Sequence, residues 1–164
     1  MKNYQDFYQA YGEYNVLFNQ LNLESPSVAY SWRKTKKIIE DEAAQIINKL
    51  ARDNKIKIAD VGYGNGAMLI RLASRLKDRT NIELIGFDIS KPFVQFANKA
   101  AEYKNLRGIA FIEADLENDD FGQGKFDMII CLEVIEHLKD PINFLKKAYG
   151  ALKDGGWLLL STPN

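Results

Sequence analysis

Two segments of the chain combine acidic residues and glycines in a way that suits ligand binding. Residues 58–66 read Ile-Ala-Asp-Val-Gly-Tyr-Gly-Asn-Gly, an apolar run that leads into a glycine-rich turn. Glycines at alternate positions allow unusual backbone angles and the close approach of a ligand. When a helix follows such a turn, its first N–H groups can bind a carboxylate or a phosphate. The second segment, 84–88, ends in Asp88, where a carboxylate can accept hydrogen bonds from both hydroxyls of a ribose.

Two further acidic positions allow two interpretations each. Asp60 could hold an ammonium group of a ligand or could cap the N–H groups of the glycine turn. Asp115 follows a short apolar stretch and could bind a base, or it could cap a turn within the acidic run 115–120. Both carboxylates remain candidates for a nucleoside-type ligand.

The residues Glu133, Glu136 and His137 form the pattern Glu-x-x-Glu-His. On a helical turn, positions i, i+3 and i+4 share one face, so the three side chains could converge on Mg²⁺ or Mn²⁺. Without a metal, Glu136 would cap the turn. His137 would then serve as a general base, as a hydrogen-bonding wall of a substrate pocket or as a packing residue. The sequence leaves these alternatives open.

The elements that must position these residues alternate between strands and helices. Apolar stretches predict strands at 56–61, 82–87, 109–113, 125–131 and 157–161. Helices are predicted at 67–76, from Ser90 to about 101, and after Asp140-Pro141, the last with Ile142, Leu145, Tyr149 and Leu152 on its buried face. Gly155-Gly156 would form a turn before the last strand. This alternation is typical of an α/β, Rossmann-like, doubly wound parallel sheet, which binds ligands beyond the carboxyl ends of its strands.

The first third of the chain is predicted to be helical. Residues 1–54 would form a cap on the substrate side, ahead of a nucleotide-binding domain at 55–164. An aromatic face predicts a helix that would pack on the domain or close over a ligand, formed by Tyr4, Phe7, Tyr8, Tyr11, Tyr14 and Phe18. A break at Ser25-Pro26-Ser27 precedes a second helix that continues to Leu50.

Composition narrows the function classes. The chain has 22 basic and 22 acidic residues, and this balance argues against a strong non-specific grip on nucleic acid. Cys131 is the only cysteine, so no intramolecular disulfide can form, and it is expected to pack rather than to react. No apolar run has the length of a membrane span. We expect a cytoplasmic protein.

Four segments together resemble a class I S-adenosylmethionine (SAM) dependent methyltransferase. Residues 131–138, Cys-Leu-Glu-Val-Ile-Glu-His-Leu, are similar to the signature after strand four in small-molecule methyltransferases. Residues 159–164 are similar to the end of strand five in quinone-pathway O-methyltransferases. The resemblance implies the strand order 3-2-1-4-5 and two further strands that this chain lacks. Strand five would then leave an edge open to self-association or to a partner.

The resemblance also implies which residues bind SAM. The methionine end would be held by Asp60, Gly62, Tyr63, Gly64 and Gly66 and lined by Cys131, Leu132 and Glu133. The adenosine end would be held by Asp88 at the ribose, Ile89 against the adenine face, and Asp115 with Leu116 at the adenine amino group. Tyr63 departs from the smaller residue that many relatives have.

The expected function is a SAM-dependent transfer of a methyl group to an oxygen atom of a small-molecule acceptor, with Glu136 and His137 facing that acceptor. Three alternatives stay open. The chain could be a non-catalytic SAM-binding module, a metal-assisted RNA ribose methyltransferase, or an NAD-binding domain, since Gly62-x-Gly64-x-x-Ala67 also fits the dinucleotide fingerprint. The charge of Asp60 would repel a pyrophosphate, and no residues remain for a separate substrate domain, so the NAD alternative is the weakest.

Overall fold

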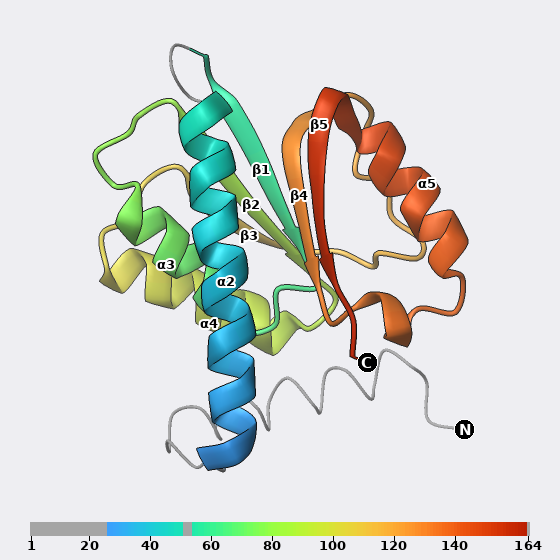
Figure 1. Ribbon diagram of the computed structural model, residues 1–164, viewed down its shortest axis with the longest axis horizontal. Coiled ribbons are helices and arrows are strands. Elements are labelled where there is room, and N and C mark those ends of the chain that lie inside the picture. Colours follow the sequence, from blue (N-terminus) through green and yellow to red (C-terminus); the bar gives the residue numbers. More distant parts are fainter. Residues whose placement is uncertain (1–25, 51–53, 164) are drawn as a thin grey trace.

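The computed structural model of the protein describes residues 26–50 and 54–163, and a five-stranded parallel sheet lies at their centre (Figure 1). The strands are β1 (Ile56–Val61), β2 (Ile82–Asp88), β3 (Ile109–Glu113), β4 (Phe126–Leu132) and β5 (Leu152–Ser161). Their order is β3-β2-β1-β4-β5, and every pairing is parallel. The fold class and the strand order expected from the sequence are confirmed. The aromatic segment 4–18 lies outside the described residues.

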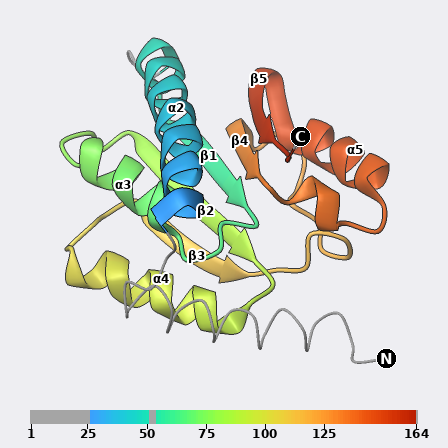
Figure 2. The same cartoon turned by 60° about the horizontal axis from the view of Figure 1, so that its bottom comes forward.

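Helices cover both faces of the sheet, as Figures 1 and 2 show. One face carries α2, α3 and α4, and the other carries α5. Their bounds are α2 (Pro26–Leu50), α3 (Ala67–Arg75), α4 (Lys91–Tyr103) and α5 (Pro141–Ala151), and a 3₁₀ turn, η1 (Ile135–His137), precedes α5. No helix in the described part of the chain is both long and apolar enough to cross a bilayer.

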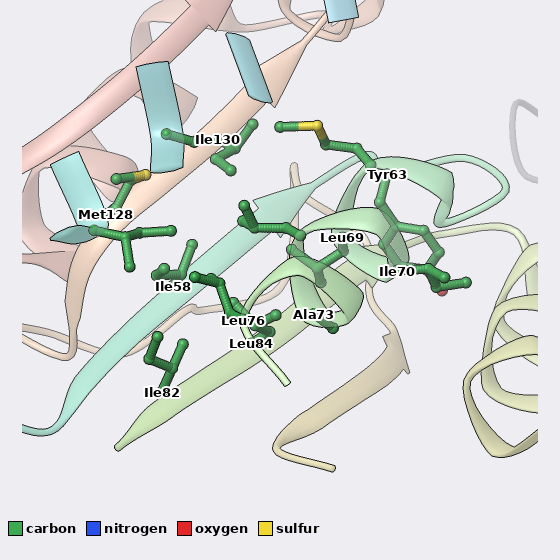
Figure 3. Packing of buried hydrophobic residues seen from close by; sticks show 14 of the residues in the cluster. Ile58, Tyr63, Leu69, Ile70, Ala73, Leu76, Ile82, Leu84, Met128 and Ile130 are labelled. Atoms are coloured by element: carbon green, nitrogen blue, oxygen red, sulfur yellow. The ribbon is translucent and has the colours of Figure 1, made fainter. Parts of the chain in front are cut away.

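The first core lies between the sheet and the three helices of one face. The apolar spacing of α3 places Leu69 and Leu72 over the sheet, where both side chains are fully buried. Figure 3 shows this helix packed over Ile58 of β1 and Leu84 of β2. Burial of each such side chain stabilises the fold by about 1.5–3 kcal/mol, so this layer holds β1 and β2 rigidly below the loops that follow them.

The second core lies under α5, and here the predicted buried face is only half right, because Leu145 and Leu152 pack against the core but the other two predicted residues do not. Ile142 is 60% exposed and Tyr149 is 82% exposed. The buried residues of the helix are instead Phe144, Ala148 and Ala151. Two apolar stripes overlap on this helix, and the small alanines let it approach the sheet more closely than the longer side chains would. Periodicity alone does not distinguish the two stripes.

The strand β5 begins five residues earlier than predicted, and Gly155-Gly156 lie within it rather than in a preceding turn. The register moves from Phe126↔Leu152 to Met128↔Trp157, so residues 153–156 bulge out of the ladder. Gly155 has a left-handed φ of 74° in this bulge. A left-handed glycine serves a bulge as readily as a turn, which is why the sequence pattern was misread.

Asp127 ties the amino-terminal ends of three strands together. Its Oδ2 accepts a hydrogen bond from the Lys57 backbone N–H of β1 at 2.8 Å. The same oxygen lies 2.7 Å from Nζ of Lys153, which projects from the bulge of β5. This end of the sheet is thereby closed by structural contacts, and the opposite, carboxyl end is the one left for a ligand.

The outer edge of β5 has no strand beside it in the described part of the chain. Trp157 and Leu160 are among the exposed large apolar residues there. The open strand edge expected from the sequence is therefore seen among the described residues.

We predict that Gly86→Ala destabilises the fold by about 1–3 kcal/mol, because overpacking forces neighbours to move. A Cβ at Gly86 would lie 2.6 Å from Cδ1 of both Tyr63 and Phe111. Urea unfolding of the variant and the parent chain measures the difference.

Gly150→Ala is the matched control, because a Cβ there meets nothing within 4 Å. In a helix this change should stabilise the fold by about 0.5–1 kcal/mol. Equal unfolding midpoints for the two variants would contradict the packing argument.

Candidate functional site

The glycine loop that follows β1 forms one wall of the candidate site. Gly62, Gly64 and Gly66 all adopt left-handed φ angles, of 69°, 59° and 73°. The N–H of Gly62 donates to the Phe87 carbonyl at 2.7 Å, which extends the β1–β2 pairing one residue past the strand. A Cβ at Gly62 would collide with the side chain of Val134. Glycine is therefore required here both by the backbone angle and by the close approach of the loop after β4.

Asp88, the last residue of β2, connects the glycine loop to the start of α4. Its Oδ2 accepts the N–H of Gly64 at 2.8 Å, and its Oδ1 accepts the N–H of Ser90 at 2.8 Å. The space beside Gly64 is open, since a Cβ there would meet only a ring atom of Phe93, at 4.0 Å. The loop is thus held in shape by a carboxylate while its outer side stays free for a ligand.

The chemistry of Asp88 fits a ribose. Burial raises the pKa of its carboxyl to about 6, and the N–H groups of Ser90 and Gly64 partly oppose this shift. A carboxylate has roughly four acceptor sites, and the two backbone bonds use one on each oxygen. The remaining sites can accept two ribose hydroxyls. The residues present therefore fit the nucleoside end of SAM.

Asp60 and Cys131 lie deep beside the site. Asp60 is buried in β1, opposite Gly86 of β2 and Ile130 of β4. Burial, and then the charges of Asp60 and Glu136, raise the pKa of the Cys131 thiol to about 12. The thiol is therefore protonated at neutral pH, as suits a packing residue rather than a nucleophile.

The side chain of Tyr63 packs into the first core (Figure 3). Its ring lies 4.8 Å from that of Phe111, and Gly86 leaves the space that the ring fills. Burial, followed by the charge of Asp88, raises the pKa of its hydroxyl above the usual range. The hydroxyl oxygen is buried and has no hydrogen-bond partner among the described residues. Tyr63 thus anchors the glycine loop from below, and its backbone is the part that lies in the loop.

Asp115 makes local bonds in a tight turn after β3. Its Oδ1 accepts the N–H of Glu117 at 2.9 Å, and its Oδ2 accepts the side-chain amide of Asn118 at 2.8 Å. Leu116 is buried in the second core, and Ile89 is half-buried just past the end of β2. The capping interpretation of Asp115 thus describes its contacts in this structure, and an adenine contact stays a prediction.

The expected metal triad is not formed. Only residues 135–137 are helical, as a 3₁₀ turn, and Glu133 lies before it with a left-handed φ of 55°. The shared α-helical face on which the metal hypothesis depended is therefore absent. No group of three His, Cys, Asp or Glu side chains in the described residues is arranged to hold a metal ion. The hypothesis of bound Mg²⁺ or Mn²⁺ does not fit these residues.

Ser161, at the end of β5, is a contact that the sequence reasoning missed. Its hydroxyl donates to Oε1 of Glu133 at 2.7 Å, and its carbonyl accepts the Glu133 N–H at 3.0 Å. These two bonds hold the strained backbone of Glu133. The only signal in the sequence was the polar Ser161-Thr162 pair at the end of an apolar strand.

Glu136 and His137 lie at the exposed rim of this segment. The hydroxyl of Thr162 lies 3.4 Å from Oε2 of Glu136. Nε2 of His137 lies 3.9 Å from Oε1 of Glu136, and the imidazole is more than half exposed. An imidazole beside a carboxylate at an open rim can exchange a proton with a bound molecule.

Comparison with known proteins identifies related sequences and folds. The tRNA U34 carboxymethyltransferase of Campylobacter hominis is 36% identical over 108 residues, which cover 65% of this chain and 35% of that protein. The ubiquinone biosynthesis O-methyltransferase of Acinetobacter baumannii is 28% identical over 109 residues, covering 66% and 44%. The chain thus spans less than half the length of these two relatives.

A solved structure shows the same fold at lower sequence identity. The carbon methyltransferase DszA superimposes with a TM-score of 0.70 at 22% identity, over 78% of this chain and 35% of that one. The model of a family described as a methyltransferase domain matches residues 34–164, which is well over half of the chain. With that match and the 3-2-1-4-5 sheet, this chain belongs to the class I SAM-dependent methyltransferase family.

Proposed function

We propose that the protein binds SAM in the crevice beyond β1, β2 and β4 and transfers its methyl group to an oxygen atom of a small-molecule acceptor. One observation carries the cofactor half of this proposal. The buried carboxylate of Asp88 holds Gly64 by its N–H and keeps further acceptor sites beside an open glycine loop. The relative named as an O-methyltransferase supports the reaction type.

The residues around the loop would each bind a different part of the cofactor. Asp60 with the backbone of Gly62, Tyr63, Gly64 and Gly66 would bind the methionine end. Asp88 would accept the ribose hydroxyls. When bound, the cofactor supplies a methyl group that its sulfonium already activates, so positioning is the main task of the protein. The rest of the cofactor site would be lined by Ile89, Asp115, Leu116, Cys131, Leu132 and Glu133.

On the acceptor side, we assign His137 the role of general base. It would take the proton of the acceptor hydroxyl, and Glu136, 3.9 Å away, would stabilise the imidazolium that results. Residues 1–54 would cap the acceptor side. The open edge of β5 would bind a second copy or a partner, and the protein would work in the cytoplasm.

RNA is the second candidate acceptor, because a relative named as a tRNA-modifying enzyme is 36% identical. The equal numbers of basic and acidic residues weigh against it, since nucleic-acid sites usually carry a basic face. A metal-assisted RNA mechanism has no support in the described residues, whose acidic and histidine side chains form no metal-binding group.

We predict saturable, one-to-one binding of S-adenosylhomocysteine (SAH) and none of NAD in parallel calorimetric titrations. Asp88→Ala should weaken SAH binding about ten- to several-hundred-fold, since each charge-assisted bond is worth about 1.5–3 kcal/mol. Circular dichroism of the variant controls for folding. Binding of NAD in place of SAH would show that the glycine loop has been misassigned.

The affinity for SAH should also depend on pH. The carboxyl of Asp88 has a pKa of about 6 in the free protein, and only its ionised form accepts both hydroxyls. Affinity should be constant above about pH 6 and fall by up to about tenfold for each pH unit below it. Titrations from pH 5 to pH 8 measure this profile.

Asp88→Asn, which cannot ionise, should bind SAH more weakly at pH 7.5 and show no inflection near pH 6. A parent chain that binds equally well at pH 5 and pH 7.5 would rule out the ribose role of Asp88.

Transfer of labelled methyl groups to hydroxylated small molecules, compared with transfer to tRNA, tests the acceptor class. His137→Ala should lower turnover by about 100- to 10,000-fold, the usual contribution of a general base, while SAH affinity stays the same. Labelling of tRNA alone would favour the second candidate. SAH binding without transfer to either acceptor would favour a non-catalytic SAM-binding module.

A further inference from the structure

The turn after β3 is a hydrogen-bonded unit built around Asp115. Besides the two bonds to its carboxylate, its carbonyl accepts the N–H of Asp119 at 2.7 Å, and its own N–H donates to Oδ2 of Asp119 at 2.7 Å. Glu117 belongs to this unit, because its N–H is bonded to Asp115. A ligand that restrains Asp115 therefore also restrains the backbone of Glu117.

The side chain of Glu117 leaves this turn and reaches the chain just before α5. Its Oε1 accepts the N–H of Lys139 at 2.5 Å and lies 3.4 Å from the N–H of Asp140. Asp140 is the N-cap of α5, where its side chain accepts the N–H of Asn143. A carboxylate is favourable at a helix N-terminus, which bears a partial positive charge.

A second, independent contact docks the same turn on α5. Nζ of Lys147 donates to the Leu116 carbonyl at 2.9 Å and lies 5.1 Å from the centre of the Phe121 ring. Phe121 in turn packs edge-on against Phe144 at 6.1 Å. The turn therefore stays attached to the helix without Glu117. What Glu117 adds is a restraint on Lys139 and Asp140.

These two residues directly follow the rim segment of the site. His137 is two positions before Lys139, and Leu138 between them donates its N–H to the Ile135 carbonyl of η1 at 3.3 Å. The end of this segment is thus fixed by the carboxylate of Glu117, which lies 22 positions from Lys139 in the sequence.

We propose that Glu117 is a positioning residue that couples a ligand at the adenine end of the crevice to the order of the segment carrying Glu136 and His137. This inference rests on the proposed function. According to this proposal, contact of the ligand with Asp115 restrains the turn further. Glu117 transmits that restraint to the N–H groups of Lys139 and Asp140. The acceptor-facing segment becomes ordered when the cofactor is present, with no change in the fold.

Amide hydrogen exchange of the full chain, resolved by residue with NMR, tests the coupling. In the parent chain, saturating SAH should slow exchange at Lys139 and Asp140. In Glu117→Ala these two amides should exchange about tenfold or more faster without ligand, since a charge-assisted bond is lost. Addition of SAH should then leave their rates unchanged. SAH affinity should stay within about threefold of the parent value, because no cofactor contact is removed.

Two further variants separate coupling from loop stability. Glu117→Gln keeps an acceptor oxygen without the charge, and it should restore part of the SAH-dependent slowing. Asp120→Ala removes an equal charge three positions away, where the carboxylate accepts the N–H of Gly122 within its own turn. In Asp120→Ala, the amides of Lys139 and Asp140 should exchange at the same rates as in the parent chain, with and without SAH.

Equal slowing by SAH in the parent chain and in Glu117→Ala would overturn the coupling and leave the proposed function standing. Parent-like exchange at Lys139 in ligand-free Glu117→Ala would overturn it as well. Absence of SAH binding to the parent chain, seen in the calorimeter beforehand, would overturn the proposed function and the coupling together.

Discussion

The carboxylate of Asp88 holds together the two loops that are proposed to bind the cofactor. It can do so because β1 and β2 pair in parallel, with Val61 opposite Phe87, so that both strands end at the same level. The Gly62 N–H continues the ladder to Phe87, and Gly64 then comes within reach of Asp88. The energetic cost of burying this carboxylate, visible in its raised pKa, is offset by bonds to Gly64 and Ser90 and would be offset further by ribose hydroxyls.

The shape of the glycine loop is set by the core below it. The ring of Tyr63 packs against Phe111 beside Gly86, and Gly62 is pressed against Val134. Because the interior is close-packed, the loop has little freedom to collapse when no ligand is present. Because a preorganised loop of this kind is already ordered, little binding free energy is lost to ordering it when a ligand binds. This suits a reaction that depends mainly on alignment.

The polar contacts at the two ends of the sheet join different parts of the chain. Asp127 closes the amino-terminal end by binding the backbone of β1 and the lysine of the β5 bulge. At the carboxyl end, polar contacts join loops that belong to different strands. Ser161 holds Glu133, and Glu117 holds the chain before α5. The same kind of bond therefore joins strands at one end of the sheet and joins loops that follow different strands at the other.

Much of the fold could be predicted from the sequence, because local patterns carry it. The strands at 56–61 and 109–113 have the bounds that their apolar runs indicated, and the parallel order follows from alternation with helices. The predictions that failed concern choices that local patterns leave open. The buried stripe of α5 was partly misassigned, and the glycines before Trp157 form a bulge within β5.

The sequence by itself determined the fold class, the family and the acids and glycines at the strand ends. Tertiary structure decided what those residues contact. The positive φ of Glu133 breaks the helix that a metal triad would need, because Ser161 of a neighbouring strand holds its backbone and its carboxylate. Asp115 folds back on its own turn, and Glu117 reaches a segment 22 positions away. The contacts of Asp115 are local, and a capping role was one of the two that its sequence context allowed. Those of Glu133 and Glu117 join residues that are distant in the chain, so no spacing in the sequence encodes them, and only the packing of strands and loops brings them together.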